Sequence, residues 1–77
     1  MRKRDELKDP NSCINRAHDD ELTFVLLGRD ASAPTAILAW VDSRLKQGKN
    51  KSYDPQIIDA LDTAYAMDFE RKFIRNR

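Results

Sequence analysis

Two stretches of the sequence space their apolar side chains about 3.6 residues apart, which is typical of amphipathic helices. The first follows Asp30 and Ser32, either of which can cap a helix, and it tolerates Pro34 in its first turn. Gly48 can end this helix, so we expect it to run to about Gln47. The residues of its stripe are Ala33, Ile37, Trp40, Val41, Arg44 and Leu45.

The second helix has the clearest start in the chain, because Asp54 can act as the N-cap and Pro55 fits the first helical position. Its pattern predicts a helix that reaches roughly Ile74, antiparallel to the first across a short polar loop at residues 48–53. The stripe consists of Ile58, Leu61, Tyr65, Phe69 and Phe73, flanked by Ile57, Ala64 and Met67.

Residues 22–27, LTFVLL, are apolar on both faces of a pleat and predict a β-strand, which Gly28 would end at a positive φ. A lone strand needs a hydrogen-bonding partner. We expect the same strand of a second copy to supply it about a two-fold axis. Pairing with residues 13–17 in a monomer is the alternative. The predicted fold class is α+β, one N-terminal strand followed by an antiparallel two-helix hairpin.

Residues 1–20 show neither helical nor alternating periodicity, apart from a turn at Pro10 and Asn11. We interpret them as an extended polar arm, partly disordered, that precedes a strand and helical-hairpin domain at residues 21–77. A chain of 77 residues makes one small domain with little stability to spare, so association is plausible.

Composition places the chain among cytoplasmic proteins. Charged residues make up 35%, and no run approaches the roughly 18 apolar residues of a membrane span. The basic N-terminus has no apolar h-region behind it, which argues against a secretory signal. A single cysteine, Cys13, excludes an internal disulfide.

Catalytic and metal-binding patterns are weak. Cys13, His18, Asp19 and Asp20 match no zinc spacing, and no third group is evident that would orient a Cys and His pair. The acidic Asp19, Asp20 and Glu21 fit a solvated cluster better than an acid and base pair. We therefore expect a protein that is not an enzyme and that uses no metal or cofactor.

The turn GRDASAP suggests a phosphate site, because Gly28 allows close approach, Arg29 offers a guanidinium and helix amides follow Ser32. Asp30 would repel an anion unless capping occupies it, and a plain turn is the alternative. The other residues assigned to this hypothetical site are Asn15 and Arg16 from the arm, and Lys49, Lys51 and Tyr53 from the loop between the helices.

The segment SCINRAHDDELTFVLLGRDASAPTAILAWVDSRL, with DPQIIDALDTAYAMD, resembles a group of short phage and prophage proteins without an assigned function. The resemblance spans about residues 12–68, contains no catalytic motif and implies a mobile-element origin. The matching positions are Asn15, Ala17, Asp20, Glu21, Phe24, Val25, Leu26, Asp30, Ala33, Pro34 and Trp40.

Two functions compete. The first is an oligomeric anti-defence protein that sequesters a nucleotide-derived signalling ligand in pockets between subunits. The second is a phage regulatory protein that binds nucleic acid through basic segments such as ERKFIRNR, or binds a host protein. The first requires basic side chains to converge near residues 28–33, whereas the second requires a continuous exposed basic or apolar face.

Overall fold

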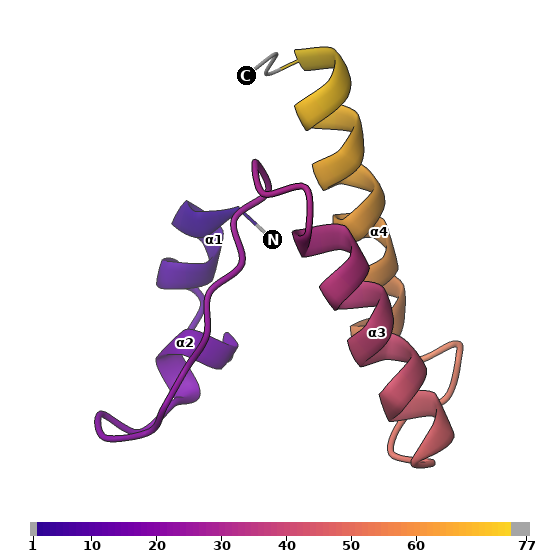
Figure 1. Ribbon diagram of the computed structural model, residues 1–77. Coiled ribbons are helices and arrows are strands. Elements are labelled where there is room, and N and C mark those ends of the chain that lie inside the picture. Colours follow the sequence, from indigo (N-terminus) through magenta and orange to yellow (C-terminus); the bar gives the residue numbers. More distant parts are fainter. Residues whose placement is uncertain (1, 75–77) are drawn as a thin grey trace.

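The main body of the chain is a pair of antiparallel helices, seen on the right of Figure 1. The computed structural model describes residues 2–74. Helix α3 spans Ala33–Lys46 and helix α4 spans Pro55–Phe69, after which η1 continues the same rod as a π-helix at Glu70–Ile74. The predicted helical hairpin is therefore confirmed.

The helix boundaries follow the local signals that the sequence carries. Asp54 is the N-cap residue of α4 and Pro55 its first helical residue. Gly48 has φ +70°, the left-handed conformation that ends helices. Its N–H donates to the carbonyl of Leu45, and the next amide donates to the carbonyl of Arg44, both at 3.1 Å. This is a Schellman motif, and it explains why α3 stops where the chain turns toward α4.

The core between the two helices is small. Ala33 and Ile57 are fully buried, Ala64 is 2% exposed and Val41 is 6% exposed. Among these, Ile57 is the large side chain that is completely enclosed. The enclosed apolar volume therefore depends largely on one isoleucine.

The predicted stripe of α4 is rotated away from this core. The helix turns Ile57 and Ala64 toward α3, whereas Ile58, Tyr65 and Phe69 are exposed. Neighbouring residues on a helix differ by 100°, so choosing Ile58 in place of Ile57 as the centre moves the buried face by more than a quarter turn. The tightest packing uses the small Ala64, not the aromatic side chains.

The predicted β-strand is wrong. Residues 22–27 follow an extended course, yet residues 2–74 contain no strand or sheet, so the α+β fold class is overturned in favour of a helical one. Leu22 is 98% and Phe24 87% exposed. The segment from the arm that could have paired with them, residues 13–16, is helical instead. Without a ladder partner, apolar and β-branched composition alone does not make a strand.

The arm is not extended throughout, because it contains two short helices, α1 at Lys3–Lys8 and α2 at Cys13–Arg16. Ser12 is the N-cap of α2, and its hydroxyl accepts a hydrogen bond from the amide of Asn15 at 3.3 Å. The predicted turn at residues 10–11 is present, since the amide of Asn11 donates to the Asp9 carboxylate at 2.8 Å. Local capping thus folds a segment that has no apolar periodicity of its own.

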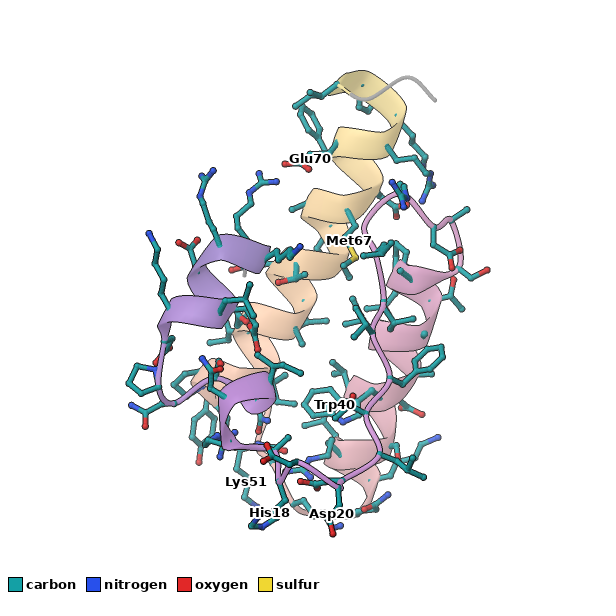
Figure 2. The ribbon with its side chains drawn as sticks, turned by 90° about the vertical axis from the view of Figure 1, so that its left-hand side faces the viewer. His18, Asp20, Trp40, Lys51, Met67 and Glu70 are labelled. Carbon is teal, nitrogen blue, oxygen red and sulfur yellow. The ribbon has the colours of Figure 1, made fainter. Side chains whose placement is uncertain are left out.

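Contacts at Arg2 and at Gly28 help to join the arm and the extended segment to the hairpin. Arg2 forms a bidentate ion pair with Glu70 of η1. Gly28 lies against Met67, and a Cβ added to Gly28 would be 3.3 Å from the Met67 Cγ. The expected positive φ at Gly28 is wrong, since among the described residues only Gly48 has one. Gly28 is suited to close packing, with Met67 beside the extended chain in Figure 2.

The chain is open for its size. It exposes 6457 Å², whereas a folded monomer of this mass exposes about 4,800 Å². Its radius of gyration is 13.4 Å, compared with about 11.5 Å for a compact domain of this length. Figure 1 shows the reason, since the arm and the extended segment form one limb and the hairpin the other. Within residues 2–74, no helix has the length and apolar character needed to cross a membrane.

We predict that Ile57→Ala destabilises the protein by about 3 kcal/mol, because it removes the large enclosed side chain and leaves a cavity between α3 and α4. Thermal unfolding followed by circular dichroism measures the effect. Leu38→Ala is the control, since Leu38 is on α3 but 43% exposed, and it should cost well under half as much. Equal losses would contradict this assignment of the core.

The two glycines should respond differently to alanine. Gly48→Ala should lower the free energy of unfolding by about 1 kcal/mol, because alanine is strained at positive φ. Gly28→Ala should be close to neutral, since the flexible Met67 side chain can move by a few tenths of an ångström and alanine restricts the unfolded chain. Urea unfolding of both variants tests this, and a larger loss at Gly28 would refute it.

Candidate functional site

The residues assigned to a ligand site by sequence lie at three separate places. Gly28, Arg29 and Ser32 are in the turn before α3, Asn15 and Arg16 are on α2, and Lys49, Lys51 and Tyr53 are in the α3–α4 loop. The turn and the loop are at opposite ends of α3, about 21 Å apart (Figure 1). One copy of the chain therefore does not gather these residues around a single ligand.

The turn before α3 is organised by Asp30. Its carboxylate accepts a hydrogen bond from the Ser32 amide at 2.8 Å, and its carbonyl accepts one from the Ala33 amide at 3.0 Å. The Ser32 and Ala33 amides already donate hydrogen bonds within the turn, and Pro34 has no amide hydrogen. Asp30 therefore occupies the amides that a phosphate would need. This geometry matches the plain turn that we considered as the alternative.

Asn15 is used to stabilise the arm. Its side-chain amide lies within hydrogen-bonding distance of the carbonyls of Glu6, Leu7 and Asp9, at 3.1, 2.9 and 2.9 Å. The carbonyls of Glu6 and Leu7 are among the last of α1, which have no partner within the helix, whereas that of Asp9 also accepts from the Ser12 amide at 3.0 Å. The guanidinium of Arg16 is exposed and lies 3.6 Å from the Cys13 Sγ. Asn15 therefore fixes the arm, while Arg16 is available at the surface.

The α3–α4 loop is held by Asn50, a residue that sequence reasoning missed. Its Oδ1 accepts from the Arg44 Nε at 2.6 Å, and its amide donates to the Asp54 carboxylate at 3.0 Å. The Lys51 amide donates to the same carboxylate oxygen at 2.9 Å. Asp54 therefore ties the loop together, and it makes no side-chain cap for α4. The Asn-x-x-x-Asp-Pro spacing before a helix is the signal that could have indicated this network.

Arg44 also lies over the indole of Trp40, with its guanidinium carbon 5.5 Å from the ring centroid. This distance is within the range of cation–π attraction. Arg44 therefore contacts both Asn50 in the loop and Trp40 on α3.

The N-terminal arm meets the far end of the hairpin through an ion pair. Arg2 pairs with Glu70, while Arg71 pairs with Asp68 at 2.8 Å. The ion pair with Glu70 raises the pKa of the Arg2 guanidinium. Carboxylates thus neutralise two of the arginines at this junction, which weakens it as a surface for nucleic acid.

An open hollow of about 330 Å³ lies between the two limbs of the chain. We call it the Trp40 hollow. It is lined chiefly by apolar atoms of α3, α4 and the extended segment, with carboxylates on its border. Figure 2 shows the Trp40 side chain in the space between the arm and α3. The lining residues that define it are Leu26, Ala36, Ile37, Trp40, Ala60 and Thr63, with Glu6 and Asp59 as the carboxylates.

A second open hollow, of about 360 Å³, is lined by Cys13, Arg16, Ala17, Glu21 and Thr23. Its acidic Glu21 accepts a hydrogen bond from the His18 amide at 3.0 Å. Within residues 2–74, no cluster of three metal-ligating side chains forms. The carboxylate beside Arg16 makes this hollow a poor match for a phosphate group.

The extended segment at residues 22–27 is the most exposed apolar part of the molecule. Leu26 is partly buried and lines the Trp40 hollow, which anchors the segment to the hairpin. Leu22, Phe24 and Val25 point away into solvent. The backbone amides of residues 22–26 make no hydrogen bond to any described residue. Residues 22–25 are therefore an extended peptide whose side chains and backbone amides are both open to a partner.

A scan against protein-family models and searches of curated proteins and of solved structures find no match to this chain. The resemblance to short phage proteins and the sequestration of a nucleotide-derived ligand therefore stay predictions. Native mass spectrometry of the purified protein would show any small molecule that it retains.

We predict that the loop network makes stability depend on pH. The hydrogen bond from the Lys51 amide, followed by that from Asn50, lowers the pKa of Asp54 from its ordinary value of 3.8. A carboxyl group whose pKa falls on folding stabilises the protein above its ordinary pKa, and this contribution is lost as the pH falls through the lowered value. Asp54→Asn should therefore reduce the thermal midpoint at neutral pH and match the wild type at strongly acidic pH.

Asp42→Asn is the control for this measurement, because Asp42 is an exposed carboxylate that pairs with Lys46 on the same helix. It should change the midpoint little at any pH. A constant difference between Asp54→Asn and the wild type across the titration would contradict the role given to the Asp54 charge.

Proposed function

We propose that this chain acts by binding another protein, to which it presents the extended apolar segment at residues 22–27. The observation that carries the proposal is the exposure of Leu22 and Phe24 on a stretch, residues 22–26, whose backbone amides donate to none of the described residues. A single exposed apolar side chain needs no explanation, but a contiguous group of them is typical of an interaction site.

The form of the segment indicates how a partner would recognise it. An extended peptide is bound through its backbone amides and carbonyls, and through pockets that accept alternate side chains. Here Leu26 fixes one side of the segment to the hairpin, so the remaining apolar side chains are held in place before binding. Such preorganisation reduces the entropy that binding costs.

Protein binding agrees better with the geometry than the other proposed activities. Nucleotide sequestration needs basic groups to converge, and the turn, the arm and the loop keep them apart within one copy. Nucleic-acid binding needs a continuous positive face, and Glu70 and Asp68 interrupt the one at the junction of the two ends. The apolar segment needs no rearrangement to meet a partner.

The experiment is site-specific photocrosslinking in cells that express the protein. A photoreactive benzoylphenylalanine replaces Phe24 in one variant and Tyr53 in the control, since Tyr53 is also an exposed aromatic residue but lies in the α3–α4 loop. We expect a discrete adduct with one other protein from position 24 and none from position 53. A synthetic peptide of residues 19–29 should compete for the partner and reduce the yield of the adduct from position 24.

Equal labelling from both positions, or adducts with further copies of this chain alone, would overturn the proposal. Identification of the crosslinked protein by mass spectrometry then supplies the partner. Leu22→Ser with Phe24→Ser should abolish its capture while leaving the helical circular dichroism unchanged, because neither side chain is packed in the core.

A further inference from the structure

A second apolar surface lies on the side of α4 that faces away from α3. One stripe of apolar residues runs along α4 and η1, with spacings of seven, four and four residues that keep them on the same side of the helix. Its members are Ile58, Tyr65, Phe69 and Phe73. Tyr65 is 69% and Phe69 56% exposed, and the rings of Phe69 and Phe73 lie 5.2 Å apart. We call this surface the α4 face. It differs from the extended segment and from the Trp40 hollow.

We propose that two copies of this chain associate about a two-fold axis through the α4 face, with the two helices antiparallel. A two-fold contact requires a surface that is complementary to itself, so that each residue pair occurs twice. When the axis crosses the α4 face midway between Tyr65 and Phe69, Tyr65 lies opposite the partner's Phe69. The two aromatic residues that are central on the stripe then meet across the axis.

The charges on the same stripe favour this orientation. Asp62 lies toward the N-terminal end of the stripe and Lys72 toward the C-terminal end, and both are exposed. The antiparallel register that pairs Tyr65 with Phe69 also places Asp62 opposite the partner's Lys72. A parallel arrangement would instead place like charges opposite each other, which disfavours association.

The length of the α4 face agrees with one such contact. An interface of standard size buries about 800 Å² of each partner. Helical pairing over a rod of about 30 Å fits that size. The extended segment lies outside the α4 face, so self-association and the proposed protein binding use different surfaces.

Sedimentation equilibrium of the full chain tests the proposal. We expect twice the mass of 8.9 kDa at micromolar concentrations. Phe69→Ser should weaken association roughly 30-fold or more, because it removes a central aromatic side chain from both sides of the contact. Leu38→Ser is the matched control, since Leu38 is exposed on α3, away from the α4 face, and this variant should remain dimeric.

Charge reversal tests the register without removing an apolar side chain. Asp62→Lys and Lys72→Glu should each weaken the dimer about fivefold or more, and the double variant should regain the wild-type affinity. The recovery also shows that the single variants remain folded. No such recovery would overturn the antiparallel register.

Two other outcomes would overturn the dimer itself. One is a wild-type chain that sediments as a single copy at its highest soluble concentration. The other is an oligomer that Phe69→Ser leaves intact, which would place the contact elsewhere. Neither outcome affects the crosslink from position 24, so failure of the dimer and failure of the proposed protein binding are distinguishable.

Discussion

The burial of Ile57 between α3 and α4 is the contact on which the rest of this structure depends. The other buried residues of the two helices are Ala33, Pro34, Val41 and Ala64, so the helices enclose little apolar volume. The loop that brings α4 back onto α3 is stabilised by hydrogen bonds among Arg44, Asn50 and Asp54. Local polar contacts therefore position the helices, and one apolar side chain joins them.

A core this small leaves most large apolar residues outside it. Tyr65, Phe69 and the residues of the extended segment are exposed because the hairpin has no second layer to cover them. Exposed apolar surfaces of this kind are typical of interaction sites. We have assigned the extended segment to another protein and the α4 face to a second copy, since the former offers an open backbone and the latter a self-complementary stripe.

The sequence predicts the hairpin well because its signals are local. Asp54 with Pro55 marks the start of α4, and Gly48 marks the end of α3, without reference to distant residues. The buried face of α4 was harder to predict from sequence. Ile57 and Ile58 are adjacent, and only packing against α3 decides which of the two is buried. The strand prediction was wrong because a strand needs a second strand to pair with. Whether one is present cannot be read from residues 22–27 themselves.

The candidate site could be predicted only in part, for a related reason. Asn15 has a polar side chain that suits a ligand, but the short α1 leaves carbonyls that the same amide satisfies. A helix of six residues shows too little periodicity to be recognised from sequence. The sequence therefore did not predict that the carbonyls at the end of α1 need the Asn15 side chain as a donor. Asp30 was considered as a cap of α3, but the N-cap is Ser32 and no side chain caps the helix. The Asp30 carboxylate instead accepts a hydrogen bond from the Ser32 amide within the turn.

The ion pair between Arg2 and Glu70 joins positions that are 68 residues apart along the chain, whereas α3 and α4 meet across a short loop. Closing a long loop costs more entropy than closing a short one, and an exposed ion pair returns little free energy. We therefore expect the hairpin to form before the arm docks onto it. During synthesis, Arg2 emerges 68 residues before Glu70, so the arm can reach its native position only after α4 has been made.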